Sequence, residues 1–192
     1  MAKLISSFNI TIDGFCDHRQ SIPDTGHNVF ANELLKHTGA VIFGRSTYRL
    51  FEAFWPKAAT DPSLPEEMRE FGQLMDAAQK IVVSNTIDEV SWKNTRLIHH
   101  LDKSGTETFK KEFPKGLLIF GSPGLLTSLI QEHAIDEYYF SVQPLIAGKG
   151  KRLFDQTEPE NMQGLDFIGS QSFPAGITTL HYKKSDKNTL TF

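Results

Sequence analysis

The sequence of 192 residues contains only one cysteine, Cys16, and no long uninterrupted apolar stretch. A single cysteine excludes an internal disulfide and is compatible with a reducing compartment. The first residues, Met1-Ala2-Lys3-Leu4-Ile5, lead directly into a strand-like segment, with no long apolar run or small-residue cleavage site behind them. We therefore expect a cytoplasmic location and no membrane partner.

An excess of positive charge is also missing. The 20 Lys and Arg residues and 23 Asp and Glu residues give a formal net charge of -3, and the pI is about 6.2. Without a global positive field, nucleic acid is not an expected partner, and any phosphate binding must be local.

Repeats and low-complexity segments are absent, and the hydrophobic share of 39% is typical of a globular domain. The length favours one domain, which we expect to span residues 1–184, followed by a polar C-terminal tail at 185–192. At this size a single hydrophobic core stabilises the fold without disulfides or structural metal.

Apolar periodicity predicts alternating strands and helices. The expected strands cover residues 4–12, 40–43, 80–83, 96–98, 117–120, 137–146, 165–173 and 177–182. The expected helices cover residues 29–36, 46–54, 66–77 and a stretch between 122 and 133. This order predicts a three-layer α/β/α fold, with a mostly parallel sheet and antiparallel C-terminal strands.

Several signatures of catalysis and metal binding do not occur. The chain lacks the glycine fingerprints of Rossmann and Walker sites and the serine elbow of hydrolases. His99 and His100 are neighbours on an expected strand and would point to opposite faces. Cys16-Asp17-His18 has no fourth ligand at a known zinc spacing. We therefore expect no metal site.

A glycine turn, Gly44-Arg45-Ser46-Thr47-Tyr48, follows the buried run 40–43. Glycine permits a tight turn, a hydroxyl can cap the next helix, and the Arg45 guanidinium is a forked donor suited to a phosphate. A phosphate site and a plain turn with an exposed arginine both remain open for this motif.

Two further turns follow apolar runs. For Ser84-Asn85-Thr86 an ordinary structural turn is favoured. In Gly121-Ser122-Pro123-Gly124, Ser122 suits a helix cap and Pro123 the first helical position, which leaves N–H groups facing a possible pyrophosphate. A capped helix with nothing bound is the alternative. Because ligands bind beyond the carboxyl ends of parallel strands, the three turns together favour a dinucleotide.

Five segments in this order resemble the dihydrofolate-reductase-like superfamily. The closest similarity is to stand-alone members of the C-terminal reductase domain family of the bacterial bifunctional riboflavin-biosynthesis deaminase-reductase (RibD). The segments are Thr11-Ile12-Asp13-Gly14-Phe15, Gly44-Arg45-Ser46-Thr47-Tyr48, Phe120-Gly121-Ser122, Ile135-Asp136-Glu137-Tyr138, and the loop from Pro144 to Phe154. The resemblance covers nearly the whole chain.

The resemblance implies a dihydrofolate-reductase-like fold with NADPH as the hydride donor. By this analogy Arg45 and Thr47 would meet the 2′-phosphate, since a guanidinium pairs with phosphate better than with a hydroxyl. The implied cofactor-binding residues are Asn9, Gly44, Arg45, Ser46, Thr47, Ser84, Asn85, Phe120, Gly121, Ser122 and Leu125. The implied substrate-side residues are Phe15, Asn28, Pro144 and Gly148.

The residues expected at the substrate-binding end of the site differ from those in the better-known branches of this superfamily. Asn28 falls where dihydrofolate reductases carry an acidic residue, and Ile119 and Phe120 stand where riboflavin-pathway reductases usually carry one. Asp13 is the remaining candidate for a catalytic carboxylate. An Asp-Gly turn that only ends the strand is an equally open interpretation of Asp13.

Two functions therefore compete. The first is an NADPH-dependent reductase of a small heterocycle, resembling the riboflavin-pathway reductase or acting on a pterin. The second is an NADP(H)-binding module without turnover, which the missing family carboxylates favour slightly. The partners expected are a small molecule and a second copy of the chain, because family members often pair through their late strands.

Overall fold

Short apolar runs form the centre of the sheet in the computed structural model, which describes residues 2–154 and 163–185. In β2 (Ala40–Gly44), all four side chains before the glycine are fully buried, as are all but one in β5 (Leu117–Phe120). A strand covered on both faces has no solvent-exposed side, so polar residues do not alternate with apolar ones along it. These runs therefore belong to the middle layer.

The sheet has eight strands in the order β4-β3-β2-β5-β1-β6-β8-β7. The remaining strands are β1 (Leu4–Thr11), β3 (Gln79–Val83), β4 (Thr95–Ile98), β6 (Glu137–Gln143), β7 (Leu165–Ser172) and β8 (Thr178–Lys184). Strands β1 to β6 pair in parallel, while β8 runs antiparallel to both β6 and β7. This confirms the expected mostly parallel sheet with antiparallel C-terminal strands.

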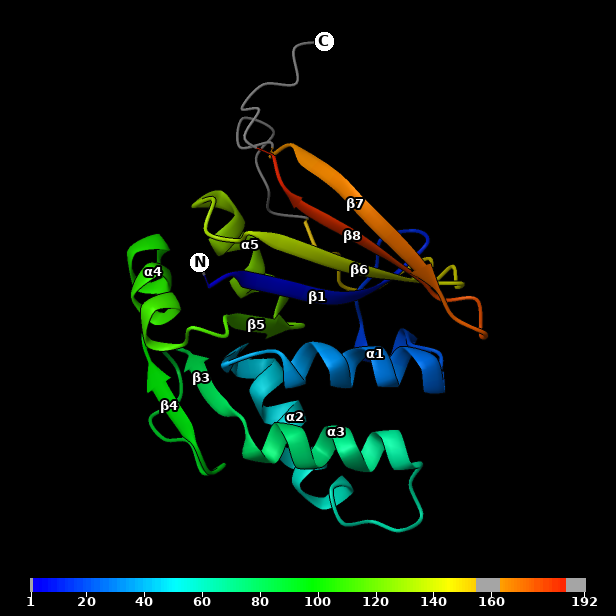
Figure 1. Ribbon diagram of the computed structural model, residues 1–192, viewed down its shortest axis with the longest axis horizontal. Coiled ribbons are helices and arrows are strands. Elements are labelled where there is room, and N and C mark those ends of the chain that lie inside the picture. Colours follow the sequence, from blue (N-terminus) through cyan, green and yellow to red (C-terminus); the bar gives the residue numbers. More distant parts are fainter. Residues whose placement is uncertain (1, 155–162, 186–192) are drawn as a thin grey trace.

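Helices cover both faces of the sheet. The helices α1 (Thr25–Lys36), α2 (Arg45–Ala58) and α3 (Glu66–Ala77) share one core cluster, and α4 (Lys103–Glu112) and α5 (Pro123–Gln131) share the other. Figure 1 shows α1 and α3 side by side below β1. The architecture is thus the three-layer α/β/α fold that the periodicity predicts.

Several element boundaries differ from the sequence expectation, among them the end of α2, which lies at Ala58 instead of residue 54. Helix α1 begins at Thr25 instead of 29, because the Asp24 carboxylate accepts the His27 N–H and caps the helix. Strand β1 ends at Thr11, one residue early. Strand β6 ends at Gln143, three residues before the expected end, since Pro144 has no N–H to continue the ladder.

Helix α4 was not expected from the sequence. The Asp102 carboxylate caps it by accepting the Gly105 N–H, but only Thr106 and Phe109 along its length are buried. A short 3-10 helix at His18–Gln20 was not expected either, and it buries none of its residues. Phe109 is the one hydrophobic residue in α4, and a single residue creates no apolar stripe. The apolar signal was therefore too weak to predict α4.

Among the residues that the structure describes, none of the helices combines the length and apolar character that crossing a lipid bilayer requires. Apart from Ser185, the expected C-terminal tail lies outside the described residues.

Candidate functional site

Two hollows open along the edge where the parallel strands end. The first, which we call the narrow pocket, has a volume of about 400 Å³ and lies beyond β2, β3 and β4. It is lined by Gly44, Arg45, Ser46, Thr47, Val83, Ser84, Asn85, His99, His100, Leu101, Ser122, Pro123, Gly124, Leu125, Ser128, Glu132 and Lys151. The three glycine and serine turns thus meet at one edge of the sheet.

The second hollow, the wide cavity, has a volume of about 830 Å³. It lies between the carboxyl ends of β1 and β5 and the helices α1, α2 and α3. Five residues line both hollows and form what we call the bridge: Ser46, Thr47, Ser122, Pro123 and Lys151. One continuous cleft therefore runs past the N-terminal ends of α2 and α5.

The bridge is held together by hydrogen bonds between its two turns. The Ser122 hydroxyl accepts the Gly44 N–H at 2.8 Å, and the Ser122 N–H donates to the Thr47 hydroxyl at 3.0 Å. Neither α2 nor α5 has a side-chain cap, so the expectation that a hydroxyl would cap each helix is wrong. Ser122 does hold the N-cap position and Pro123 follows it, but the hydroxyl bonds across to β2 instead.

The backbone of Gly121 lies close to the bridge. Gly121 has φ of 63°, and a Cβ built on it would lie 3.3 Å from Thr47 Cγ2. Ser122 also has a left-handed conformation, with φ of 60°. Two successive left-handed residues turn the chain so that the start of α5 faces the cleft. The first N–H groups of α2 and α5 lack intrahelical partners and carry positive helix-dipole charge, which suits an anion.

Arg45 lies at the outer end of the narrow pocket. Its guanidinium donates one hydrogen bond to the Thr86 hydroxyl at 2.8 Å, and Ser84 contacts the same hydroxyl at 3.3 Å. The turns after β2 and β3 are thereby joined. Because a guanidinium has five N–H donors, this one bond leaves others to bind a phosphate.

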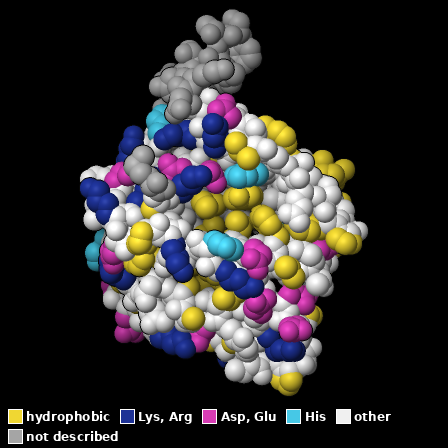
Figure 2. Space-filling model, viewed as in Figure 1, with side chains coloured by type: hydrophobic (Ala, Val, Ile, Leu, Met, Phe, Trp, Pro, Cys, Tyr) yellow, Lys and Arg dark blue, Asp and Glu magenta, His cyan; other side chains and the backbone are white. Residues whose placement is uncertain are grey.

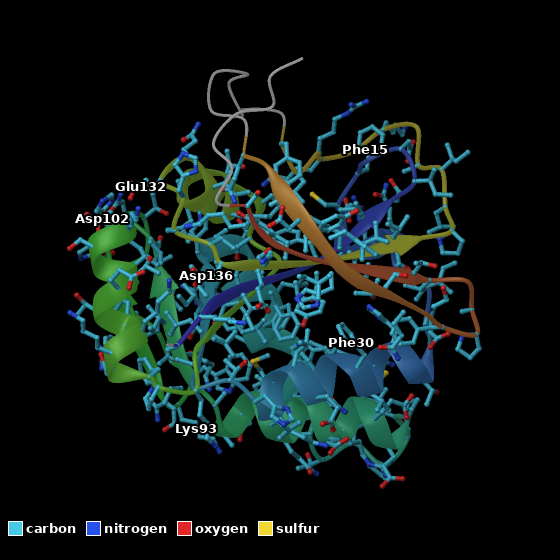
Figure 3. The ribbon with its side chains drawn as sticks, turned by 45° about the horizontal axis from the view of Figure 1, so that its top comes forward. Phe15, Phe30, Lys93, Asp102, Glu132 and Asp136 are labelled. Atoms are coloured by element: carbon cyan, nitrogen blue, oxygen red, sulfur yellow. The ribbon has the colours of Figure 1, made fainter. Side chains whose placement is uncertain are left out.

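The wide cavity has an aromatic wall. Phe51 and Trp55 of α2, Phe71 of α3 and Phe120 of β5 form a cluster in which the Trp55 and Phe71 ring centroids are 4.4 Å apart. Phe51 stacks on Phe120 at 6.5 Å with an angle of 26° between the rings. Figure 3 shows Phe30 directed from α1 toward the sheet, and Phe30 also lines the cavity. This part of the cleft suits a flat apolar ring.

His27 adds a half-buried polar group to the wide cavity. Its Nε2 lies 2.9 Å from the Ser141 hydroxyl, which in turn contacts the Thr179 hydroxyl at 2.7 Å. Burial lowers the pKa of His27, and the nearby Asp24 carboxylate only partly opposes this effect. The imidazole is therefore mostly neutral at neutral pH.

Asp13 does not line either hollow. Its carboxylate accepts hydrogen bonds from the Thr11 hydroxyl at 2.6 Å, the Gly148 N–H at 2.7 Å and the Ala147 N–H at 3.1 Å. These bonds, led by that of Thr11, lower the pKa of Asp13 to about 2. This geometry favours the Asp-Gly turn and makes Asp13 an anchor for the loop after β6.

The other residues expected from the sequence separate into two groups. The cofactor-binding residues all line the cleft, with Leu125 in the narrow pocket and Asn9, Phe120 and Gly121 in the wide cavity. Of the expected substrate residues, only Asn28 lines the wide cavity. Phe15, Pro144 and Gly148 line neither hollow, and Phe15 is buried under the Arg152 guanidinium at 4.9 Å.

Sequence reasoning missed most of the wide cavity. Its helical lining comes from α1, α2 and α3, including Phe30, Phe51, Trp55, Met68 and Phe71. An apolar helix residue that faces a cavity has the same spacing as one that packs in the core. Lys151, at the bridge, belongs to a segment that the resemblance marks, Pro144 to Phe154, but it was not singled out.

Comparison with known proteins gives a family match over most of the chain. The family model described as the RibD C-terminal domain matches residues 2–179. The uncharacterized protein YyaP of Bacillus subtilis is 24% identical over 191 residues, with 94% of each chain covered.

Solved structures share the fold at lower identity. A putative riboflavin biosynthesis protein from Shewanella superposes with a TM-score of 0.70 at 19% identity, covering 95% of this chain and 99% of that one. A diaminohydroxyphosphoribosylaminopyrimidine deaminase/5-amino-6-(5-phosphoribosylamino)uracil reductase from Thermotoga maritima gives a TM-score of 0.64 at 13% identity. That alignment covers 96% of this chain and 57% of the Thermotoga chain.

Proposed function

The chain belongs to the RibD C-terminal domain family, and we propose that it is an NADPH-dependent reductase of a small heterocyclic substrate. Its fold is that of riboflavin-biosynthesis-type reductases. One observation carries the proposal: the narrow pocket and the wide cavity share a wall made by the N-terminal ends of two helices. A pyrophosphate at this wall would place a nucleoside on each side.

The residues present fit such a cofactor. Arg45 would hold the 2′-phosphate, and Ser84 and Asn85 would flank the adenosine in the narrow pocket. At the bridge, the first N–H groups of α2 and α5 would bind the pyrophosphate, with Lys151 adding a positive charge. Gly121 lets the backbone approach closely there. When bound, NADPH supplies the hydride, and the protein positions and shields it.

The size of the wide cavity favours turnover over binding alone. Its volume of about 830 Å³ is within the range of whole ligand sites, and the nicotinamide end of the cofactor is smaller than such a ligand. Space for a second molecule beside the nicotinamide is what a reductase needs and a binding module does not. Asn28 and His27 are among the polar groups there that can orient a substrate.

The cofactor assignment is tested by titrating the protein with NADPH and NADH by isothermal calorimetry. We expect NADPH to bind more tightly, and Arg45→Ala to weaken NADPH about 10- to 100-fold, because charge-assisted hydrogen bonds contribute about 1.5–3 kcal/mol. NADH affinity should hardly change. The matched control is Arg96→Ala, which removes a surface arginine paired with Glu112 outside the cleft.

Equal affinities for NADPH and NADH, or an Arg45→Ala variant with unchanged NADPH binding, would contradict the phosphate assignment. Turnover is measured as loss of NADPH absorbance with added heterocycles. If no NADPH is oxidised although it binds tightly, the non-catalytic NADP(H)-binding module is the better description.

The proposal also includes a homodimer in the cytoplasm. Among the described residues, β7 is one of the two edge strands of the sheet, and three of its hydrophobic side chains are exposed: Leu165, Phe167 and Ile168. Figure 2 shows hydrophobic side chains over β7 and in a hollow between β6 and α1. Exposed apolar groups on one face favour contact with a second copy.

A further inference from the structure

The charged side chains around the wide cavity indicate which class of heterocyclic substrate fits it. We propose that the substrate is a flat, uncharged ring compound without a phosphate group. This inference rests on the proposed function, because it assumes that NADPH occupies the narrow pocket and the bridge. It differs in substrate class from the phosphoribosyl compound named for the Thermotoga relative.

Among the residues that the structure describes, Arg49 and Lys151 are the Arg and Lys side chains that line the wide cavity, and both have other roles. Arg49 donates to Glu52 Oε2 at 3.2 Å, so the Glu52 carboxylate offsets the positive charge of its guanidinium. Lys151 stands at the bridge and also lines the narrow pocket, where the cofactor phosphates would lie. Neither forms a cluster of the kind that binds a phosphate monoester, which needs several donors around one group.

Two carboxylates face the same space. Asp17 lines the cavity and pairs with Arg19, while Glu67 accepts a hydrogen bond from the Thr25 hydroxyl. The formal charges of Asp17, Glu67, Arg49 and Lys151 cancel. A phosphate monoester carries a charge of about -1.5 to -2 at pH 7. Such a group would be repelled by the carboxylates or left without a partner, and both arrangements are costly.

His27 does not supply the missing charge. His27 is mostly neutral because burial lowers its pKa. His18 lies 3.5 Å from Asp17, and 60% of its side chain is exposed at the rim. The walls themselves come from aromatic and aliphatic side chains of α1, α2, α3 and β5. Offset or edge-to-face packing on these rings favours a planar apolar ligand.

The experiment uses the full chain saturated with NADP⁺, with binding measured by calorimetry and by fluorescence of Trp55, which lines the cavity. The probes are a panel of uncharged bicyclic heteroaromatics including benzimidazole, the phosphoribosyl derivative of benzimidazole, and a pterin. We expect at least one uncharged ring to bind, and benzimidazole to bind at least about tenfold tighter than its phosphoribosyl derivative. Tighter binding of the phosphoribosyl compound, or no binding by any uncharged ring, would overturn the proposal.

Two variants test whether the probes bind in the wide cavity. Trp55→Ala should weaken the uncharged ring about tenfold without changing NADP⁺ affinity, whereas Phe54→Ala, one residue earlier and outside the lining, should not. Met68→Arg adds a cation to the wall and should shift the preference toward the phosphoribosyl compound. If neither Trp55→Ala nor Met68→Arg changes probe binding, the site lies elsewhere.

Failure of this inference can be told apart from failure of the proposed function. Absence of NADP⁺ binding overturns both. Tight NADP⁺ binding together with a preference for the phosphorylated probe overturns only the substrate class.

Discussion

At the scale of single residues, polar side chains in this protein bind partners that are distant in the sequence. The Ser122 hydroxyl accepts the N–H of Gly44, and the Asp13 carboxylate accepts the N–H groups of Ala147 and Gly148. Ser122 was a candidate helix cap and Asp13 a candidate catalytic acid, but each side chain joins two loops. The contact between Ser122 and Gly44 shapes the narrow pocket, whereas the contacts of Asp13 hold the loop after β6.

Asp13→Asn is expected to loosen the loop after β6 and lower the melting temperature at pH 7. The hydrogen bonds that lower the pKa of Asp13 from 3.8 to about 2 stabilise the charged form in the folded state. That stability is present above pH 3.8 and is lost as the pH falls through about 2. The variant should therefore lose less stability than the wild type between pH 4 and pH 2 in thermal melts.

Asp88→Asn, which changes an exposed carboxylate, is the matched control for Asp13→Asn. A role of Asp13 in catalysis makes a different prediction. If the variant kept its melting temperature but its turnover number fell at unchanged NADPH affinity, Asp13 would act on the substrate and the anchor role would be wrong.

At the scale of elements, the end of α3 shows how the fold satisfies its backbone. The carbonyl groups in the last turn of a helix have no intrahelical partner. Here the buried Lys80 ammonium donates to the carbonyls of Met75, Asp76 and Ala78, and Asn94 donates to that of Ala77. Burial lowers the pKa of Lys80 to about 8, an effect that Asp76 opposes. A lysine thus caps α3 from the neighbouring strand β3.

Lys80→Met should destabilise the protein by about 1–3 kcal/mol, because it leaves buried carbonyl groups without a donor. The variant also loses the contact between the Lys80 ammonium and the Trp92 ring at 4.6 Å. Urea unfolding followed by circular dichroism measures this change. Lys115→Met, at an exposed position, should differ from the wild type by less than about 0.5 kcal/mol. Equal stability of the two variants would show that the capping bonds contribute nothing net.

At the scale of the whole molecule, the sheet divides into a functional half and an outer half. The cleft lies at the carboxyl ends of the parallel strands, where helix N-termini converge. The antiparallel strands β8 and β7 extend the sheet beyond β6 and contribute no residue to either hollow. A bulge between Phe167 and Gly169 interrupts the ladder of β7, and bulges of this kind oppose edge-to-edge pairing. The outer half is therefore suited to association through its exposed side chains.

Phe167→Asp is expected to convert a dimer into a monomer. The Phe167 residue is 59% exposed, and a carboxylate at this position would be buried without a partner in an apolar interface. Sedimentation velocity of wild type and variant at micromolar concentration measures the change. Ile12→Asp, at a residue that is 64% exposed in the loop after β1, is the control and should remain dimeric. A monomeric wild type, or a Phe167→Asp variant that stays dimeric, would contradict the expected interface.

The sequence predicted the fold class well because the signals for it are local. The apolar runs 40–43 and 117–120 are short, β-branched or aromatic in part, and closed by Gly44 and Gly121, so they identify buried strands without knowledge of their neighbours. The helix at Glu66–Ala77 was predicted with both its ends. The helix α4 was missed because Phe109 is its one hydrophobic residue, so its sequence carries no apolar periodicity.

The three turns of the cleft were also predicted by local reasoning, since the turns that follow parallel strands must meet at one edge of the sheet. The cofactor roles of their residues came from the family resemblance and stay predictions. Only the tertiary structure decided how these groups are used. It joined Ser122 to Gly44, turned Asp13 away from the cleft, and left a cavity between Phe30, Trp55 and the carboxyl end of β1. Apolar spacing is the same for a side chain that fills a core and for one that lines a hollow. Packing in three dimensions alone distinguishes them.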